Sequence, residues 1–370
     1  MKVGLLTNIV SPHQLPLAQA IVEVVGAENY RYVHTEEFHA QRAKMGWSAT
    51  VAAGIRVEPM GPESRTWLEA ADLVYTEERD FELIGRRLAA GRRTFYVSER
   101  WLKPIGIGIG GRCRCRLPGW LRLLHPGYVK MVWRFLRFFG DPNFRYLAQG
   151  KWAERDMRLL ARICGRRLRP QDIVRWGYFV APSAVAEARH SAAGASAGMG
   201  GPKCRRVLWV GRLLDWKRVD TIIYAVAAVA KESSITLTIV GDGPERTRLM
   251  KLASVLDVAA RELQLPTFRF RPSVPIGEVR KLMREHDVYV LASNGQEGWG
   301  AALNEALEEG MLAVGTFEAG SSSYLLPASN LFHAGDYHRL AELLADDIPR
   351  VEIGEWSAAN AARRLLEMAS

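Results

Sequence analysis

The chain has 370 residues, more than one hydrophobic core of ordinary size accommodates, so two domains are expected. Its 48% hydrophobic and 24% charged residues exclude a disordered chain, and no apolar run approaches the roughly 20 residues that span a bilayer. The formal net charge of +10 predicts an anionic partner, whereas four irregularly spaced cysteines argue against a disulfide framework.

Short apolar runs alternate with longer helical patterns along the whole chain. In the first half, strands are expected at residues 3–6, 30–34, 55–59, 73–75, 94–97 and 174–180. In the second half, they are expected at residues 206–210, 235–240, 267–270, 288–292, 312–316 and 331–333. Strand and helix alternating twice over predicts two α/β units, each built on a parallel sheet.

Residues 101–140 interrupt this pattern, because they contain eight Lys or Arg and no acidic residue. Aromatic and aliphatic residues are interleaved with these cations, and Pro126 and Gly127 divide the stretch into two predicted helical pieces. Two interpretations stay open. The stretch is either a basic amphipathic segment that lies on an anionic membrane or a helical insertion that packs on the N-terminal domain.

The segment Val207–Asp220 reads VLWVGRLLDWKRVD, a strand that ends at Gly211 and a loop with Arg212 and Lys217 before a helix. Arg binds phosphate oxygens in a bidentate fork, Lys adds a point charge, and a helix N-terminus adds backbone N–H donors. Ligands of open α/β sheets bind at the carboxyl ends of strands. The segment therefore predicts a diphosphate site, the alternative being two solvated loop charges.

Two further strand–loop–helix junctions follow. The glycines of Gly241-Asp242-Gly243 permit a sharp turn and the close approach of a ligand. In QEGWGAALNE, Glu297 stands in the loop and Glu305 about one and a half turns inside the next helix. Two carboxylates so placed can bind hydroxyl pairs at opposite ends of a nucleotide sugar. Alternatively, Glu305 is a solvent-exposed surface residue. Glu297 would then only place a negative charge near the positive N-terminal end of the helix.

The second half resembles the donor-binding domain of GT-B glycosyltransferases, particularly the retaining glycosyltransferase family 4, or group 1. Five segments stand in that family's order: GRLLDWKRVDTII, LTIVGDGPERTRL, VPIGEVRKLMREHDVYVLAS, EGWGAALNEALEEG and NLFHAGDYHRLAELL. Their joint occurrence is far more specific than any one of them. The first half is similar to bacterial surface-polysaccharide transferases in GLLTNIVSPHQLPLAQAI and FYVSERWLKP.

The resemblance implies an α/β fold of the GT-B type, in which two Rossmann-like parallel-sheet domains face a cleft. Residues 1–190 would form the acceptor-binding domain, with a basic amphipathic helical insertion at 101–140. Residues 191–205 would be the linker and 206–354 the donor-binding domain. Residues 355–370 would form a C-terminal helix that returns to the N-terminal domain.

The resemblance also implies roles for individual residues. Arg212 and Lys217 would hold the donor diphosphate and stabilise the charge on the departing nucleoside diphosphate. Glu305 would accept hydrogen bonds from the ribose hydroxyls, and Glu297 would face the transferred sugar and join the two cations as the catalytic set. Other donor contacts are expected from the backbone of Gly298, Trp299, Gly300 and Ala301, and from Gly241, Asp242 and Pro272. His13 is the candidate on the acceptor side.

The implied activity is retaining, metal-independent transfer of a hexosyl group from a nucleoside-diphosphate sugar, with no other cofactor. The acceptor would be a cell-envelope polysaccharide, a lipid-linked glycan or a secondary metabolite. We expect a cytoplasmic protein, peripheral on the inner face of the cytoplasmic membrane if residues 101–140 bind lipid. The alternatives are a non-catalytic GT-B protein that binds nucleotide sugar or a partner, and a sugar-nucleotide epimerase. Nucleic-acid binding is not expected, because no recognisable module accompanies the charge.

Three positions depart from the family's pattern. The loop Val10-Ser11-Pro12-His13-Gln14 stands where many relatives have a glycine pair, and Pro272 stands where they often have glycine. Tyr324 lies near the position of the glutamate in the family's Gly-Gly-x-x-Glu loop, which is represented here by EAGSSSYLL. We therefore expect differences in the contacts to the acceptor, the donor base and the sugar.

Overall fold

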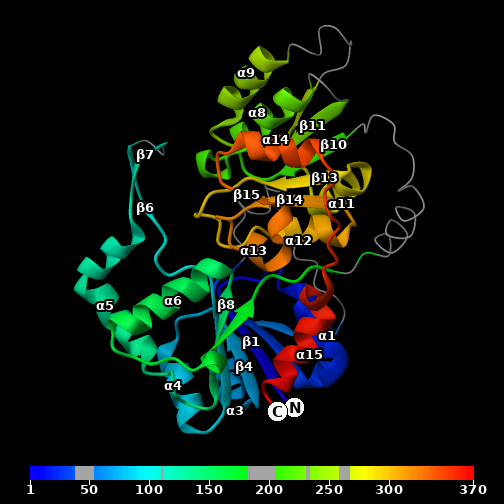
Figure 1. Ribbon diagram of the computed structural model, residues 1–370. Helices are drawn as coiled ribbons and strands as arrows, with labels where there is room; N and C mark the ends of the chain where they lie inside the picture. The colour runs from blue at the N-terminus through cyan, green and yellow to red at the C-terminus, as the bar shows by residue number, and fades with distance from the viewer. Residues whose placement is uncertain (38–53, 110–111, 182, 184–204, 231–233, 258–266) are drawn as a thin grey trace. The chain divides into compact units, whose positions relative to one another are not determined.

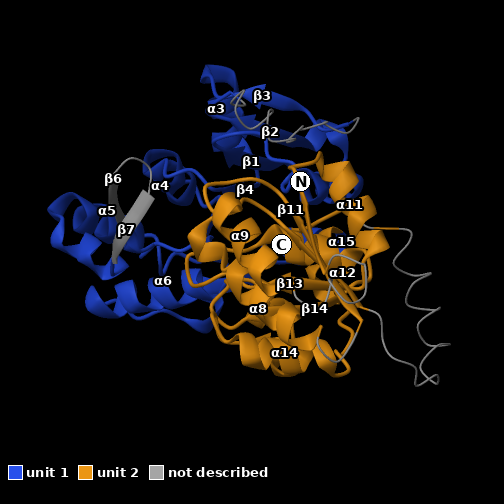
Figure 2. Ribbon diagram, turned by 90° about the horizontal axis from the view of Figure 1, so that it is seen from above, with its two compact units in different colours: residues 1–38, 49–178, 359–370 blue, residues 39–48, 179–358 orange. Residues whose placement is uncertain are grey.

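The computed structural model describes residues 1–37, 54–109, 112–181, 183, 205–230, 234–257 and 267–370. These residues form two compact units (Figure 2): unit 1 holds the described residues up to Tyr178 together with residues 359–370, and unit 2 runs from Phe179 to Ala358. The chain thus enters unit 2 before the linker predicted at 191–205. That linker lies outside the described residues, apart from Arg205.

Unit 1 is built on a seven-stranded sheet with the order β3-β2-β1-β4-β5-β8-β9, in which every pairing is parallel. Figure 1 labels β1, β4 and β8 of this sheet. Its strands are β1 (Val3–Thr7), β2 (Tyr30–His34), β3 (Val57–Pro59), β4 (Leu73–Thr76), β5 (Arg93–Ser98), β8 (Phe144–Gln149) and β9 (Ile173–Trp176). Six of them confirm predicted strands, whereas β8 was not predicted. β1 and β4 are buried along their whole length, as expected of central strands in a parallel sheet.

The helices of unit 1 are α1 (Leu15–Val25), α3 (Pro62–Ala70), α4 (Phe81–Ala89), α5 (Pro126–Leu136), α6 (Lys151–Ile163) and α15 (Ala358–Glu367). The start of α4 is fixed by Asp80, whose carboxylate accepts a hydrogen bond from the Leu83 backbone N–H at 2.9 Å. α15 comes from the end of the chain, and Arg364 lies over the Trp176 ring of β9, 4.9 Å from its centre.

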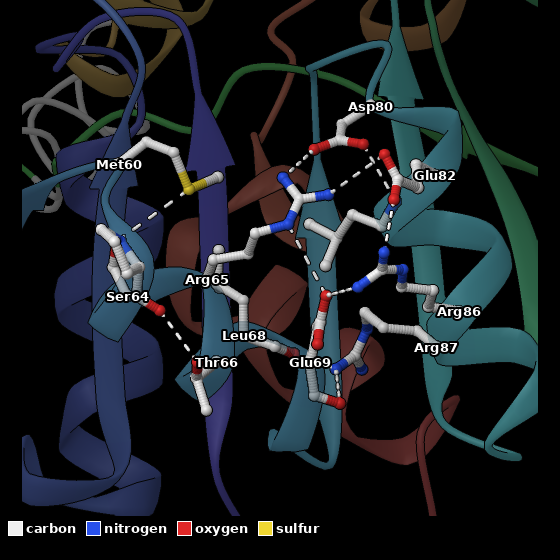
Figure 3. Close-up of polar contacts among 12 residues, drawn as sticks. Met60, Ser64, Arg65, Thr66, Leu68, Glu69, Asp80, Glu82, Arg86 and Arg87 are labelled. Carbon is white, nitrogen blue, oxygen red and sulfur yellow. Dashed lines mark hydrogen bonds and ion pairs between the residues drawn. The ribbon is translucent and has the colours of Figure 1, made fainter.

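A polar network joins α3 to α4 (Figure 3). Arg65 of α3 forms ion pairs with Asp80 at 2.9 Å and with Glu69 at 3.6 Å, and Arg86 of α4 lies 3.3 Å from the same Glu69. These pairs are partly or largely exposed, so each contributes little to stability. They connect α3 with α4 and the residue that caps it, so these two helices of unit 1 lie next to each other.

Arg87 of α4 has a different role, because its side chain is fully buried. Its guanidinium donates to the backbone oxygens of Leu68, Ala71 and Arg93, the last two at 3.0 and 2.7 Å. The first two oxygens belong to the end of α3, where helix carbonyls lack intrahelical partners. Burial lowers the pKa of Arg87 to about 10, which leaves it charged at neutral pH. A buried cation thus ties α3 to β5.

The prediction for residues 101–140 was partly wrong. Instead of a first helical piece, the chain forms an antiparallel hairpin of β6 (Ile105–Ile109) and β7 (Arg112–Leu117), followed by a 3-10 segment at Gly119–Leu124. The sequences IGIGI and RCRCRL alternate with period two, which is the strand pattern. Only the second predicted piece is an α-helix, α5, and Pro126 begins it.

Unit 2 is built on a six-stranded parallel sheet with the order β12-β11-β10-β13-β14-β15. Its strands are β10 (Arg205–Val210), β11 (Ile235–Val240), β12 (Phe268–Arg271), β13 (Val288–Leu291), β14 (Leu312–Thr316) and β15 (Leu331–Phe332). All six confirm predicted strands. The prediction of two parallel-sheet Rossmann-like domains is therefore correct.

The helices of unit 2 are α8 (Val219–Val229), α9 (Arg246–Leu256), α11 (Ile276–Glu285), α12 (Ala301–Glu308), α13 (Ser322–Leu325) and α14 (Tyr337–Ala345). α8 is apolar on most of its surface and packs against both the sheet and α14, which together form one buried cluster. None of the helices in the described part of the chain is long and apolar enough to cross a membrane.

Candidate functional site

The carboxyl ends of four neighbouring strands in unit 2 place four loops side by side. The strands β11, β10, β13 and β14 are adjacent and parallel, so the loops that follow them meet at one edge of the sheet. These loops contain the residues that the sequence predicts to bind a donor.

The loops after β10 and β11 pack closely through their backbones. The Leu213 N–H donates to the Asp242 oxygen at 2.8 Å, and the Gly241 N–H donates to the Arg271 oxygen at 3.1 Å. A Cβ atom on Gly241 would lie 1.9 Å from the Gly211 oxygen, so only glycine fits. Gly241 is thus required for loop packing. Asp242 is exposed, and its carboxylate accepts from the next backbone N–H.

The two predicted cations lie in the loop after β10. Arg212 is exposed, and within the described part of the chain its side chain makes no hydrogen bond or ion pair. Lys217 ends a 3-10 turn, and its ammonium lies 4.5 Å from the centre of the Trp216 ring. The Lys217 side chain is 18% exposed and forms an ion pair with Glu297. The structure therefore brings together one predicted cation and one predicted acid.

Glu297 is held on two sides. Its Oε2 atom accepts hydrogen bonds from the Lys217 ammonium and, at 2.9 Å, from the Ser293 hydroxyl. The Ser293 backbone oxygen in turn accepts from the Thr316 hydroxyl at the end of β14. The carboxylate is thus anchored by β13 and β14, and any anion that binds Lys217 competes with it.

The backbone around Glu297 is fixed by the loop after β14. The Gly320 N–H donates to the Glu297 oxygen at 3.2 Å, and a Cβ atom on Gly320 would lie 1.8 Å from the Gly298 oxygen. Gly300 has φ +95° and forms the N-cap of α12, a conformation that favours glycine. Ala301 begins α12 and is partly exposed. Gly320 was not predicted as a site residue, although EAGSSSYLL was aligned with the family loop.

Trp299 differs from the other predicted donor contacts, because its side chain is only 1% exposed. Its indole N–H donates to the Asn304 side-chain oxygen at 2.7 Å, and its ring lies 6.1 Å from Tyr324 and 5.6 Å from Trp356. The ring therefore supports the loop from inside, and a donor can reach only the backbone of this residue. Trp356 was not singled out from the sequence, since its partners come from distant segments.

Glu305 lies inside α12 and is 7% exposed, so the alternative of a surface glutamate is wrong. Burial raises the pKa of its carboxyl to about 7, with a contribution from Glu309, whereas Arg280 opposes the shift. Glu309 is also buried, and it forms ion pairs with Arg280 at 2.5 Å and Arg284 at 3.1 Å. A carboxyl whose pKa is raised in this way is a common property of functional sites.

Two predicted residues belong to other segments of the chain. Pro272 is exposed and directly follows β12, next to the loop after β11. His13 belongs to unit 1, where its ring lies 5.5 Å from that of Tyr178. Burial lowers the pKa of His13 to about 4, so the ring is neutral at neutral pH. Over the described ranges, no three His, Cys, Asp or Glu side chains gather as a metal site would require.

The site and the fold can now be compared with known proteins. Residues 204–346 match the family of glycosyl transferases group 1. This group 1 domain begins next to β10 and ends just after α14, so it contains all the predicted donor residues. Among curated proteins, none matches the chain significantly.

Solved structures resemble the whole chain. The Anabaena protein Alr3699/HepE in complex with UDP has 16% identity and a TM-score of 0.57, over 100% of this chain and 96% of that one. An α,α-trehalose-phosphate synthase from Burkholderia xenovorans, bound to glucose-6-phosphate, has 12% identity and a TM-score of 0.61 over 100% of both chains. The lipopolysaccharide outer core galactosyltransferase WaaB has 15% identity and a TM-score of 0.57, over 93% of this chain and 89% of that one. These similarities establish the GT-B fold.

Proposed function

We propose that the protein is a retaining glycosyltransferase that uses a nucleoside-diphosphate sugar and no metal. The observation that carries this proposal is the pairing of Lys217 with Glu297 beside Arg212, at the carboxyl edge of the group 1 domain. A cation held next to a sugar-facing acid, with a second cation open to solvent, is suited to a sugar joined to a diphosphate.

Donor binding would exchange one partner of Lys217 for another. The diphosphate takes the ammonium from Glu297 and also engages Arg212, while Glu297 keeps its hydrogen bond from Ser293 and turns to the sugar hydroxyls. Glu305 accepts from the ribose hydroxyls. The exposed Pro272 and Asp242 lie on the neighbouring loops, where the base would be.

The transfer step breaks the bond between the anomeric carbon and the β-phosphate oxygen. A bond forms between the same carbon and an acceptor hydroxyl oxygen, on the face that the phosphate leaves, so the configuration is retained. The hydroxyl proton passes to the departing phosphate oxygen, and the nucleoside diphosphate is released. Arg212 and Lys217 stabilise the charge that develops on this leaving group.

The acceptor class proposed is a cell-envelope polysaccharide, a lipid-linked glycan or a secondary metabolite. WaaB, with the same fold, is named as a galactosyltransferase of the lipopolysaccharide outer core, and HepE was crystallised with UDP-glucose. These proteins make uridine-diphosphate sugars the first donors to test.

We further propose that the protein lies peripherally on the inner face of the cytoplasmic membrane through α5 and the preceding 3-10 segment. The interior face of α5 packs in unit 1 through Val132 and Phe135, which are 1% and 0% exposed, so the packing interpretation also holds. Its outer face presents Trp133 between Lys130 and Arg137. The exposed apolar side chains of this region are Trp120, Leu124, Val129 and Trp133. Aromatic side chains among exposed cations suit an anionic lipid interface.

A cavity of about 270 Å³ beside α5 supports this assignment. Phe81 and Phe138 line it together with Arg134 and Arg137. In the part of the chain that the structure describes, neither arginine forms an ion pair. The Arg134 guanidinium lies 6.0 Å from the centre of the Phe81 ring and that of Arg137 5.7 Å from the Trp133 ring, so two cations beside aromatic rings would be available to a lipid phosphate.

The function is tested by incubating the purified protein with a panel of nucleotide sugars and recording the melting temperature and the products. We expect one of them to raise the melting temperature, and Lys217→Ala and Glu305→Ala to abolish the shift. Lys281→Ala, an exposed lysine of α11, is the matched control and should keep it. Transfer to an acceptor separates the transferase from its alternatives: an epimerase would change the sugar, and a binding protein would yield no product. Unchanged shifts in both site variants would refute the placement of the donor.

A further inference from the structure

A second group of polar side chains gathers in unit 1, outside the donor site. The strands β1, β4 and β8 all run in the same direction in one sheet, with β5 between β4 and β8. Gln14 stands in the loop after β1, Glu77 directly follows β4, and Gln149 is the last residue of β8. These three residues therefore meet at the carboxyl edge, where sheets of this kind bind ligands.

The Gln14 and Gln149 side chains lie on either side of the Glu77 carboxyl group. The Gln14 amide donates a hydrogen bond to Glu77 Oε1, and the Glu77 backbone N–H donates to the Leu6 oxygen of β1 at 3.0 Å. Gln14 is 6% exposed, whereas Glu77 is partly exposed. Of these two residues, Glu77 is therefore the one that solvent partly reaches.

The Gln149 side chain is the most deeply buried of the three. It is 2% exposed, and its hydrogen bond to the Glu77 carboxyl lowers the pKa of that group, but this contact lies outside ordinary hydrogen-bond geometry and no other described residue pairs with its Nε2 atom. A buried amide donor that is so poorly paired is costly, because it has lost its hydrogen bonds to water. A ligand oxygen that accepts a hydrogen bond from this amide would account for its place in the fold.

The state of the Glu77 carboxyl limits what that ligand can be. Burial raises its pKa to about 8, and the charges of Glu99 and Glu78 raise it further. At neutral pH the carboxyl is therefore mostly protonated and can both donate and accept a hydrogen bond. Two amides and a neutral carboxyl match sugar hydroxyls, each of which also donates and accepts.

We propose that Gln14, Glu77 and Gln149 form the subsite that binds the acceptor, and that the acceptor is a pyranoside with neighbouring hydroxyl groups. Because it names the acceptor site of the transferase proposed above, this assignment rests on that proposed function. Glu77 is a positioning residue here: it orients the acceptor and takes no proton from it. His13, the acceptor-side candidate from the sequence, precedes Gln14 in the same loop.

The test uses saturation-transfer NMR on the full chain with four methyl pyranosides, those of glucose, galactose, mannose and N-acetylglucosamine. We expect at least one to bind, and Glu77→Ala to weaken it about tenfold, the effect of losing one or two hydrogen bonds. Glu77→Gln, which keeps an acceptor and a donor, should restore most of the binding. Glu63→Ala, an exposed carboxylate of the same unit, should leave binding unchanged.

Gln149→Leu separates a binding role from a purely structural one. Removing a poorly paired buried amide should keep or raise the melting temperature, while pyranoside binding falls about tenfold. Folding of the Glu77→Ala chain is checked by its melting temperature and by its shift with nucleotide sugar, which reports on unit 2.

Lys217→Ala keeps this test independent of the donor site. It should lose the nucleotide-sugar shift and still bind the pyranoside. The subsite is refuted if none of the four pyranosides binds the unaltered chain, if Glu77→Ala and Gln149→Leu bind normally, or if Lys217→Ala alone loses binding. If no nucleotide sugar binds but pyranosides depend on Glu77, the proposed function fails and the subsite stands.

Discussion

Replacing Glu305 by glutamine is expected to stabilise unit 2 at alkaline pH while weakening its binding of nucleotide sugar. The side chain is 7% exposed, and burial raises its pKa from 4.5 to about 7. Below pH 4.5 the carboxyl is protonated in both the folded and unfolded states, and its burial carries no charge penalty. As pH rises toward 7, the unfolded chain ionises first, so the free energy of unfolding falls; above 7 it levels off.

The size of the effect follows from the difference between the two pKa values. A shift of about 2.5 units, at about 1.4 kcal/mol each, gives a loss of about 3 kcal/mol above pH 8. Glutamine stays neutral at every pH. Relative to the unaltered chain, Glu305→Gln should therefore be more stable by up to about 3 kcal/mol at pH 8.5 and by less than about 1 kcal/mol at pH 5.

The assay is hydrogen exchange of the α12 peptides along a urea series at both pH values, since a chain with two units need not unfold in one step. Comparing variants at the same pH cancels the titration of all other groups. Glu285→Gln, an exposed glutamate of α11, is the matched control and should differ by less than about 0.5 kcal/mol at either pH. An equal stability of Glu305→Gln and the unaltered chain at pH 8.5 would refute the reasoning.

Three further changes have defined outcomes. Gly320→Ala should abolish the nucleotide-sugar melting shift and lower the melting temperature, because its Cβ would lie 1.8 Å from the Gly298 oxygen and force the loop apart. Arg87→Ala should destabilise unit 1 by at least about 3 kcal/mol in urea unfolding, because two buried carbonyls and one partly buried carbonyl lose their donor. Replacing both Arg134 and Arg137 by alanine should reduce co-sedimentation with phosphatidylglycerol vesicles, and binding by the unaltered chain should weaken as salt rises.

The two changes at arginines each have a control of the same kind. Arg86→Ala, on the exposed side of α4, should cost less than about 1 kcal/mol, so an equal loss in both arginine variants would contradict the account of Arg87. Arg166→Ala with Arg167→Ala removes the same charge from another exposed part of unit 1 and should keep vesicle binding. Indifference of the unaltered chain to vesicles would leave α5 as an ordinary packed helix. A normal melting shift in Gly320→Ala would show that the loop is not part of the donor site.

The sheets were predictable because their strands are short apolar runs bounded by turns. The ends of the strands at 30–34, 235–240 and 312–316 agree with the structure to the residue. β8 was missed, since FRYLAQ contains a charge and a polar end and lies beside a basic stretch that dominated the interpretation. The predicted strand at 174–180 ends at Trp176, shortly before the chain crosses from unit 1 to unit 2.

The candidate site was predictable in its residue types and only partly in its contacts. The spacing in QEGWGAALNE indicated two acids at one strand end, and the structure buries both Glu297 and Glu305 there. The Lys217–Glu297 pair joins residues 80 positions apart, which no local pattern reveals. Trp299 was expected to contact the donor through its backbone, and its indole ring packs with Tyr324 and Trp356, which no local pattern reveals.

The hairpin within 101–140 was missed because the prediction gave more weight to charge than to residue alternation. The density of cations favoured an amphipathic helix, while the period-two alternation of IGIGI and RCRCRL indicated strands. The position of the Gln149 amide beside Glu77 could not be predicted at all, because it depends on three strands meeting at one edge.

The most direct test of the donor site is a calorimetric titration of nucleoside diphosphates into the unaltered chain and into Lys217→Ala, with the matching monophosphates beside them. A bound diphosphate must take the Lys217 ammonium from Glu297, and charge-assisted hydrogen bonds of this kind contribute about 1.5–3 kcal/mol. The account predicts that the preferred diphosphate binds about 10- to 100-fold more weakly to Lys217→Ala, with little change for the monophosphate. Equal affinities of the two chains for the diphosphate would contradict it.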